Sequence, residues 1–146
     1  MDMKEYMSAR VNDQIKWYNN KATYCQRRYK TIQIIDIIFA AVIPLLSGFA
    51  ANNKCVALII GILGVIITIL ESIQKLNKYH EKWIQYRTTS EMLKYNKNLY
   101  ETNSSPYNNE EDTIDNLFVN NIEKIISSEN NQWKDFSLKK LSGQDD

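Results

Sequence analysis

Hydrophobic residues are concentrated in two long runs in the middle of the chain. The first run lies within residues 31–51 and the second within residues 55–73, and only residues 52–54 separate them. Each run is about 20 residues long, which is the length that a helix rising 1.5 Å per residue needs to cross roughly 30 Å of hydrocarbon. The pattern therefore predicts two transmembrane helices joined by a short outer loop.

Two other interpretations of these runs compete with the membrane hairpin. A soluble bundle could bury them, but a soluble helix of this length keeps a polar face, and the two runs show almost none. Ile and Val also favour strands, but the length of each run and the absence of turn signals inside it favour helices. In lipid a helix satisfies its own backbone polar groups, which fits a membrane span.

The sequences that flank the runs are polar and compatible with helices. Residues 6–30 and 74–102 contain neither Pro nor Gly, and we expect both spans to continue through them as cytoplasmic helices. After a loop, a third helix is predicted at 112–138, where acidic residues cluster near the positive end of the helix dipole. Residues 139–146 are predicted to form a polar tail, so that 1–146 is a single all-α membrane domain. The apolar stripe of the third helix consists of Ile114, Leu117, Phe118, Ile122, Ile125 and Ile126.

The distribution of basic residues predicts the orientation of the hairpin. Five basic residues lie within 16–30, the flank before the first run, and four lie within 74–87, the flank after the second, whereas the connecting loop has Lys54 alone. The flanking residues are Lys16, Lys21, Arg27, Arg28 and Lys30, followed by Lys75, Lys78, Lys82 and Arg87. Because Lys and Arg are enriched in cytoplasmic flanks, the loop should face outside and both termini the cytoplasm. The predicted location is the inner or cell membrane, with the chain spanning it twice.

The charged and metal-ligating residues give no support to several classes of function. The 18 basic and 17 acidic side chains leave a net charge of +1, which is far from the basic surface of a nucleic-acid binder. There is no C-x-x-C pair, phosphate loop or zinc motif, and His80 is the only histidine. We therefore expect no enzyme activity, no cofactor and no metal. Cys25 and Cys55 are not expected to form a disulfide, although a reactive Cys25 thiol near Arg27 and Arg28 is an alternative.

Two acidic residues lie in or beside the predicted spans. Asp36 and Glu71 are about 16 and 17 residues from the loop, so they reach a similar depth at the cytoplasmic mouth of the membrane. An ionisable residue in a span indicates a functional site by default. The alternative is that both acids lie in the interface and pair with Lys30, Lys75 or Lys78.

Small and polar residues form one stripe on each span. The first stripe is Asp36, Ala40, Pro44, Ser47 and Ala51, and the second is Ala57, Gly61, Gly64, Thr68, Glu71 and Lys75. Such stripes let membrane helices approach closely, and they can equally line a narrow pore with acids attracting cations at its mouth. Because one hairpin cannot enclose a water-filled path, a pore requires a homo-oligomer. The candidate ion pathway comprises Asp36, Ser47, Gly61, Gly64, Thr68 and Glu71.

Four blocks of the sequence resemble a known bacterial family. They are RVNDQIKWY at 10–18, IPLLS at 43–47, WIQYRTTSE at 83–91 and SENNQW at 128–133. They are similar to two-span proteins long catalogued as a domain of unknown function and grouped with the SLATT-like effector domains. The resemblance implies a pore-forming effector of a bacterial conflict system, in which a separate partner senses infection. The sensor is then expected to be another protein.

The residues of these blocks also have a physical interpretation. Their large aromatic side chains are spaced to meet where the three cytoplasmic helices join. Arg87 and Glu91 can pair along one helix face, and Glu129 is expected to reach Arg87 from the third helix. We interpret the set as a structural clasp, with a ligand site as the alternative. The clasp residues are Trp17, Tyr18, Trp83, Tyr86, Arg87, Glu91, Glu129 and Trp133.

The leading functional hypothesis is therefore an oligomeric, cation-preferring membrane pore. Its expected partners are the lipid bilayer, further copies of the chain and a separate sensor protein, and no nucleic acid is expected. The alternative is a membrane-anchored helical scaffold whose cytoplasmic part recruits a partner. A stable complex with another protein and no conductance would distinguish the scaffold.

Overall fold

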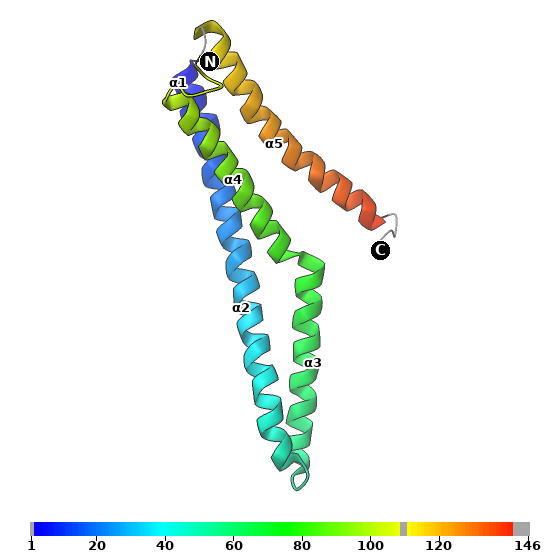
Figure 1. Ribbon diagram of the computed structural model, residues 1–146. Helices are drawn as coiled ribbons and strands as arrows, with labels where there is room; N and C mark the ends of the chain where they lie inside the picture. The colour runs from blue at the N-terminus through cyan, green and yellow to red at the C-terminus, as the bar shows by residue number, and fades with distance from the viewer. Residues whose placement is uncertain (1, 109–110, 142–146) are drawn as a thin grey trace. The chain divides into compact units, whose positions relative to one another are not determined.

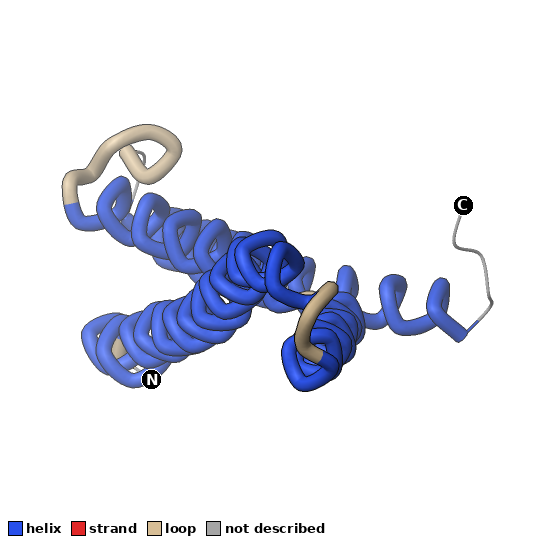
Figure 2. Tube along the Cα trace, turned by 90° about the horizontal axis from the view of Figure 1, so that it is seen from below, coloured by secondary structure: helices blue, strands red, loops and turns tan. Residues whose placement is uncertain are grey.

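The computed structural model describes the backbone of residues 2–108 and 111–141, and the side chains of residues 2–108 and 113–128. Every regular element within these residues is helical (Figure 2), so the predicted all-helical class is confirmed. The elements, labelled in Figure 1, are α1 (Met3–Tyr6), a π-helical segment (Met7–Asn12), α2 (Asp13–Ala50), α3 (Lys54–Asn77), α4 (Tyr79–Glu101) and α5 (Glu111–Leu141).

The helix α5 is the predicted third helix. It starts at Glu111 and ends at Leu141, so it includes the whole of 112–138 and the first residues of the predicted tail. The remainder of that tail, residues 142–146, lies outside the described residues.

The chain forms two compact units. The terminal unit contains residues 1–20 and 85–146, and the hairpin unit contains residues 21–84. The boundaries between the units fall inside α2 and α4, so each of these helices belongs partly to the terminal unit and partly to the hairpin unit. The fold of each unit follows from its own hydrophobic pattern.

The hairpin unit is built around the turn between α2 and α3. Asn53 has an extended backbone at the start of α3, and its side-chain oxygen accepts a hydrogen bond from the Cys55 amide at 3.0 Å. Asn is a favoured residue at this position because it satisfies one of the unpaired amides of the first helical turn. The predicted outer loop at 52–54 is thus a tight turn whose last residue, Lys54, already belongs to α3.

Each helix of the hairpin has one half-buried face. On α2 the half-buried aliphatic and aromatic positions recur three or four residues apart, as do those on α3, which is the spacing of a single helix face. They are Ile35, Phe39, Val42 and Leu46 on α2, and Ile60, Leu63, Ile67 and Leu70 on α3. The remaining faces also carry large apolar side chains, and these are exposed: Leu45 is 73%, Phe49 68% and Leu58 67% accessible.

The described chain therefore contains two helical runs, Met3–Ala50 and Lys54–Glu101, that are long and apolar enough to cross a membrane. In the most apolar stretch of each run, no residue is buried inside the protein. The large exposed apolar area argues against a soluble bundle that hides these helices in its core.

The helical path is interrupted at Lys78, whereas the sequence predicted one helix through 74–102. Lys78 adopts a left-handed conformation with φ of 47°, and its amide donates to the Gln74 carbonyl at 2.9 Å, which ends α3. The helix α4 starts at the next residue, Tyr79. A left-handed conformation costs a non-glycine residue about 1–2 kcal/mol, so a break is not expected at a lysine. The segment also contains no Gly or Pro that would have indicated the break.

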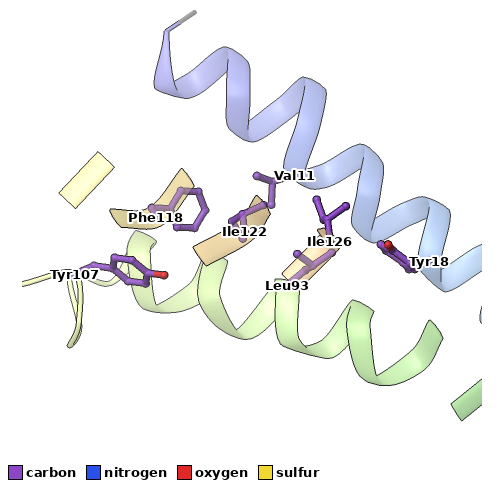
Figure 3. Close-up of a cluster of buried hydrophobic side chains, with 7 residues drawn as sticks. All are labelled: Val11, Tyr18, Leu93, Tyr107, Phe118, Ile122 and Ile126. Atoms are coloured by element: carbon purple, nitrogen blue, oxygen red, sulfur yellow. The ribbon is translucent and has the colours of Figure 1, made fainter. Parts of the chain in front are cut away.

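The terminal unit has a hydrophobic core to which four chain segments contribute. Figure 3 shows Val11 and Tyr18 from the N-terminal helices, Leu93 from α4 and Tyr107 from the loop between α4 and α5. The helix α5 adds Phe118, Ile122 and Ile126, which are spaced four residues apart and belong to the predicted apolar stripe. Ile114, Leu117 and Ile125 of the same stripe pack against this core.

Candidate functional site

The candidate ion-pathway residues lie on different faces of the hairpin. Asp36 is half-buried beside Ile35, on the face of α2 that carries the hairpin packing. Ser47, Gly61 and Glu71 are exposed. The structure thus places most of the predicted pathway on outward faces of the hairpin and turns Asp36 inward.

The hydroxyl groups of this set are satisfied within their own helices. Ser47 Oγ donates to the Pro44 carbonyl at 2.7 Å, and Thr68 Oγ1 donates to the Gly64 carbonyl at 3.0 Å. Hydroxyls that bond back to the preceding turn need no partner from another helix, so they are tolerated on a face that meets lipid.

The glycines of α2 and α3 leave open space around them. A methyl group placed on Gly48, Gly61 or Gly64 would meet no atom within 4 Å. Packing within one hairpin therefore does not require these glycines. A second helix can approach Gly61 closely, because Gly61 is exposed.

The two acids lie near the same end of the hairpin, as their distance from the loop predicted. Asp36 and Glu71 are close enough to repel each other electrostatically. Asp36 Oδ1 is buried and has no hydrogen-bond partner among the described residues. A buried, unpaired carboxylate oxygen is costly, which is typical of a group kept for function or of one that acquires a partner on assembly.

Three of the predicted clasp residues, Trp17, Tyr18 and Tyr86, are in contact in the terminal unit. The ring centroids of Trp17 and Tyr86 are 5.8 Å apart, and those of Tyr18 and Tyr86 are 6.1 Å apart. One turn further along, Ser90 Oγ donates to the Asn19 side-chain oxygen at 2.9 Å. These contacts join the first part of α2 to α4.

Among the remaining clasp residues, the structure describes the side chains of Arg87, Glu91 and Trp83. Arg87 and Glu91 pair at 3.2 Å, but their side chains are 58% and 50% exposed, and such an exposed pair adds little to stability. Trp83 belongs to the hairpin unit, where its ring centroid is 5.7 Å from that of His80. The side chains of Glu129 and Trp133 lie outside the described residues.

A second network, which the sequence analysis missed, joins the N-terminus to α5. Both Arg10 Nε and Nη2 donate to the Glu123 carboxylate, at 3.1 and 3.0 Å, and Tyr6 donates to it at 3.0 Å. The hydrogen bonds from Arg10 lower the pKa of Glu123. Burial, reinforced by Glu123, raises the pKa of Tyr6 to about 12. In the sequence Glu123 follows directly after the apolar Ile122, but nothing there indicates its partners.

A third network fixes the loop before α5. Tyr107 is fully buried, and its hydroxyl donates to the Asn96 side-chain oxygen at 2.8 Å and accepts from Asn121 Nδ2 at 2.9 Å. The hydroxyl thereby links α4 to α5. Composition marked this segment only as a loop, so its role as an anchor was not predictable.

The cysteines support neither catalysis nor cross-linking. Cys25 and Cys55 are both free, one buried and the other exposed. Burial raises the pKa of the Cys25 thiol, and the opposing effect of Lys82 and Lys21 is smaller. The alternative of a reactive thiolate activated by Arg27 and Arg28 is therefore disfavoured. Within the described residues, no group of three potential ligands could hold a metal ion.

The chain belongs to the family described as "Protein of unknown function (DUF4231)", whose model matches residues 13–115. The match includes the hairpin unit, α4 and the start of α5. No curated protein and no solved structure matches the chain.

Proposed function

We propose that this member of the DUF4231 family is a homo-oligomeric membrane pore that prefers cations. The observation that carries the proposal is the hairpin itself, whose apolar side chains are exposed on the outward faces of two long helices. Exposed apolar side chains, such as Leu45 and Leu58, recur along both helices. They are unfavourable in water, and the hydrocarbon core of a bilayer removes them from it.

The oligomeric part of the proposal rests on the outward small residues. Two helices cannot enclose a water-filled path, so several hairpins must surround it. Gly61 and Thr68 lie on exposed positions of α3, and the space around Gly61 is open. A neighbouring hairpin that packs there would bring its backbone close to α3, as small residues allow in membranes.

The preference for cations rests on Asp36 and Glu71. The exposed Glu71 is positioned to form a ring of carboxylates in an oligomer, and the nearby Asp36 adds negative potential behind it. Rings of acidic side chains attract cations to a channel mouth. The excess of Lys and Arg in the flanks supports an orientation with both termini in the cytoplasm and this mouth on the cytoplasmic side of the inner or cell membrane.

The resemblance of four sequence blocks to SLATT-like proteins supports a role as an effector of a bacterial conflict system. In that role a separate sensor protein detects infection, and conduction through the pore damages the membrane. The terminal unit is the part of the chain available for such a partner, because it lies outside the apolar hairpin.

A vesicle flux assay with the full chain tests the pore. Potassium efflux from loaded vesicles should rise more steeply than linearly with the ratio of protein to lipid, because conduction requires several subunits. Gly61→Leu should reduce the efflux, since the open space at Gly61 admits the new side chain in one hairpin but not beside a neighbouring one. The matched control is Ile62→Leu, which preserves volume at a 51% exposed position on the same helix. Inserted wild-type protein without efflux would contradict the proposal.

A membrane-anchored scaffold is the second candidate. Met92 and Tyr95 of α4 are 49% and 63% exposed in the terminal unit, which favours a surface for a protein partner. The scaffold predicts a stable complex that Tyr95→Ala weakens, together with vesicles that do not leak. Leaking vesicles that need no partner would exclude it.

A further inference from the structure

Basic residues are concentrated at the end of the hairpin unit that is remote from the turn. Residues 21–33 and 72–84 carry seven Lys or Arg side chains and one acid, Glu81. We name six of these side chains the basic collar. The basic collar consists of Arg27, Arg28, Lys30, Lys75, Lys78 and Lys82.

The fold brings the two halves of the basic collar together. Tyr29 lies within the first half and His80 within the second, and their ring centroids are 4.8 Å apart. The Lys82 ammonium is also near enough to Cys25 to act on its thiol. Basic residues that are about 50 positions apart in the sequence therefore lie at the same end of the hairpin unit.

The basic collar adjoins the exposed apolar surface of the hairpin. Ile34, which is 57% exposed, follows the first half of the basic collar, and Ile73, which is 38% exposed, precedes the second half. Long Lys and Arg stems can lie along such a surface while their charged ends reach water. On the other side, Tyr24 is 52% exposed, and the Arg28 guanidinium lies 5.5 Å from the centre of its ring. Amphipathic rings of this kind favour the headgroup level of a bilayer.

We propose that the basic collar binds the phosphodiester headgroups of anionic phospholipids, such as phosphatidylglycerol, in the leaflet that contains this end of the hairpin. The inference rests on the proposed insertion of the hairpin into a membrane but not on conduction. Clustered Lys and Arg beside a span attract anionic lipid by about 1 kcal/mol for each residue near the surface. A lipid fits better than a soluble anion because its acyl chains cover the adjoining apolar residues while its headgroup meets the charges.

Lipid titration of the full chain in neutral detergent, followed by native mass spectrometry, tests the basic collar. The wild type should bind phosphatidylglycerol at least about tenfold more tightly than phosphatidylcholine with the same acyl chains, and added salt should reduce the difference. The triple variant Arg27→Gln, Arg28→Gln, Lys30→Gln should lose most of this preference. The matched control removes three exposed lysines of the terminal unit (Lys4→Gln, Lys16→Gln, Lys124→Gln) and should retain it.

Three results would overturn the proposal. One is equal affinity of the wild type for the two lipids, which does not depend on any variant folding. Another is equal loss of preference in the basic-collar variant and the matched control. The third is full displacement of the lipid by free glycerol phosphate, which would assign the charges to a soluble anion.

A separate measurement distinguishes failure of the basic collar from failure of membrane insertion. Wild type and both triple variants should remain with phosphatidylcholine vesicles after alkaline carbonate washing, because the apolar helices hold them there. Retention without a lipid preference would reject the basic collar alone. Release of the wild type would reject both the basic collar and the membrane pore.

Discussion

Removal of the Phe118 ring should destabilise the terminal unit more than removal of an exposed ring in the same unit. Phe118 is completely buried, and its ring centroid lies 4.4 Å from that of Tyr100 and 5.6 Å from that of Tyr107. It also meets the Tyr6 ring edge-on at 6.5 Å. The Phe118→Ala substitution therefore leaves a cavity among three aromatic side chains from three segments of the chain.

The expected loss is about 3–5 kcal/mol in the free energy of unfolding, which is the range for Phe→Ala in a packed core. The loss should lie toward the upper part of this range, because the loop and the two helices that hold these rings are fixed by their own hydrogen bonds and can collapse little. The terminal unit consists of residues 1–20 and 85–146. In a folding unit of roughly 60–100 residues, a loss of 1 kcal/mol lowers the melting temperature by roughly 4–8 °C, so a drop of more than about 10 °C is expected for Phe118→Ala.

Thermal unfolding of the purified chain in mild detergent, followed by circular dichroism, measures this loss. The matched control is Tyr95→Ala, because Tyr95 is 63% exposed on α4 of the same unit. The control should shift the midpoint by no more than a few degrees. Equal shifts for the two variants would refute the packing of α5 on the N-terminal helices through Phe118.

Two further predictions concern the polar networks of the terminal unit. Tyr107→Phe leaves the Asn96 oxygen and the Asn121 amide without their shared partner, so the free energy of unfolding should fall by about 1–3 kcal/mol; an unchanged thermal midpoint would show that the bonds contribute nothing. The pKa of Tyr6 is raised to about 12 from the ordinary value of 10.0, so its contribution to stability is complete below about pH 10 and is lost as the pH rises to about 12. A difference titration of wild type against Tyr6→Phe should show a phenol ionising near pH 12, and Glu123→Gln should lower that value; ionisation near pH 10 in the wild type would refute the network.

The helices and their apolar faces could be predicted because they depend on local spacing. The runs at 31–51 and 55–73 allow helices and little else, and the stripe through Phe118 and Ile122 recurs at helical intervals. The contact of Trp17 with Tyr86 was also predictable, because the short turn fixes which positions of the two arms are level with each other.

The break at Lys78 and the long-range polar contacts could not be predicted from local pattern. Lys has no intrinsic preference for a left-handed conformation, whereas the neighbouring Asn77 is of a type that tolerates it and yet remains within α3, so the local sequence does not place the break at Lys78. The partners Arg10 and Glu123 are 113 residues apart, and many other pairings of charge were equally compatible with the sequence. Asp36 was expected to share a stripe with Ser47, but Asp36 is half-buried whereas Ser47 is exposed.

Single-channel recording of the purified chain in a planar bilayer, across a potassium chloride gradient, tests the central claim most directly. The proposed pore predicts discrete conductance steps with a reversal potential displaced toward that of potassium. It also predicts that replacement of both acids, Asp36→Asn with Glu71→Gln, moves the reversal potential toward zero. A silent membrane that contains inserted, oligomeric protein would contradict a pore, and an unchanged reversal potential would contradict the role of the two acids.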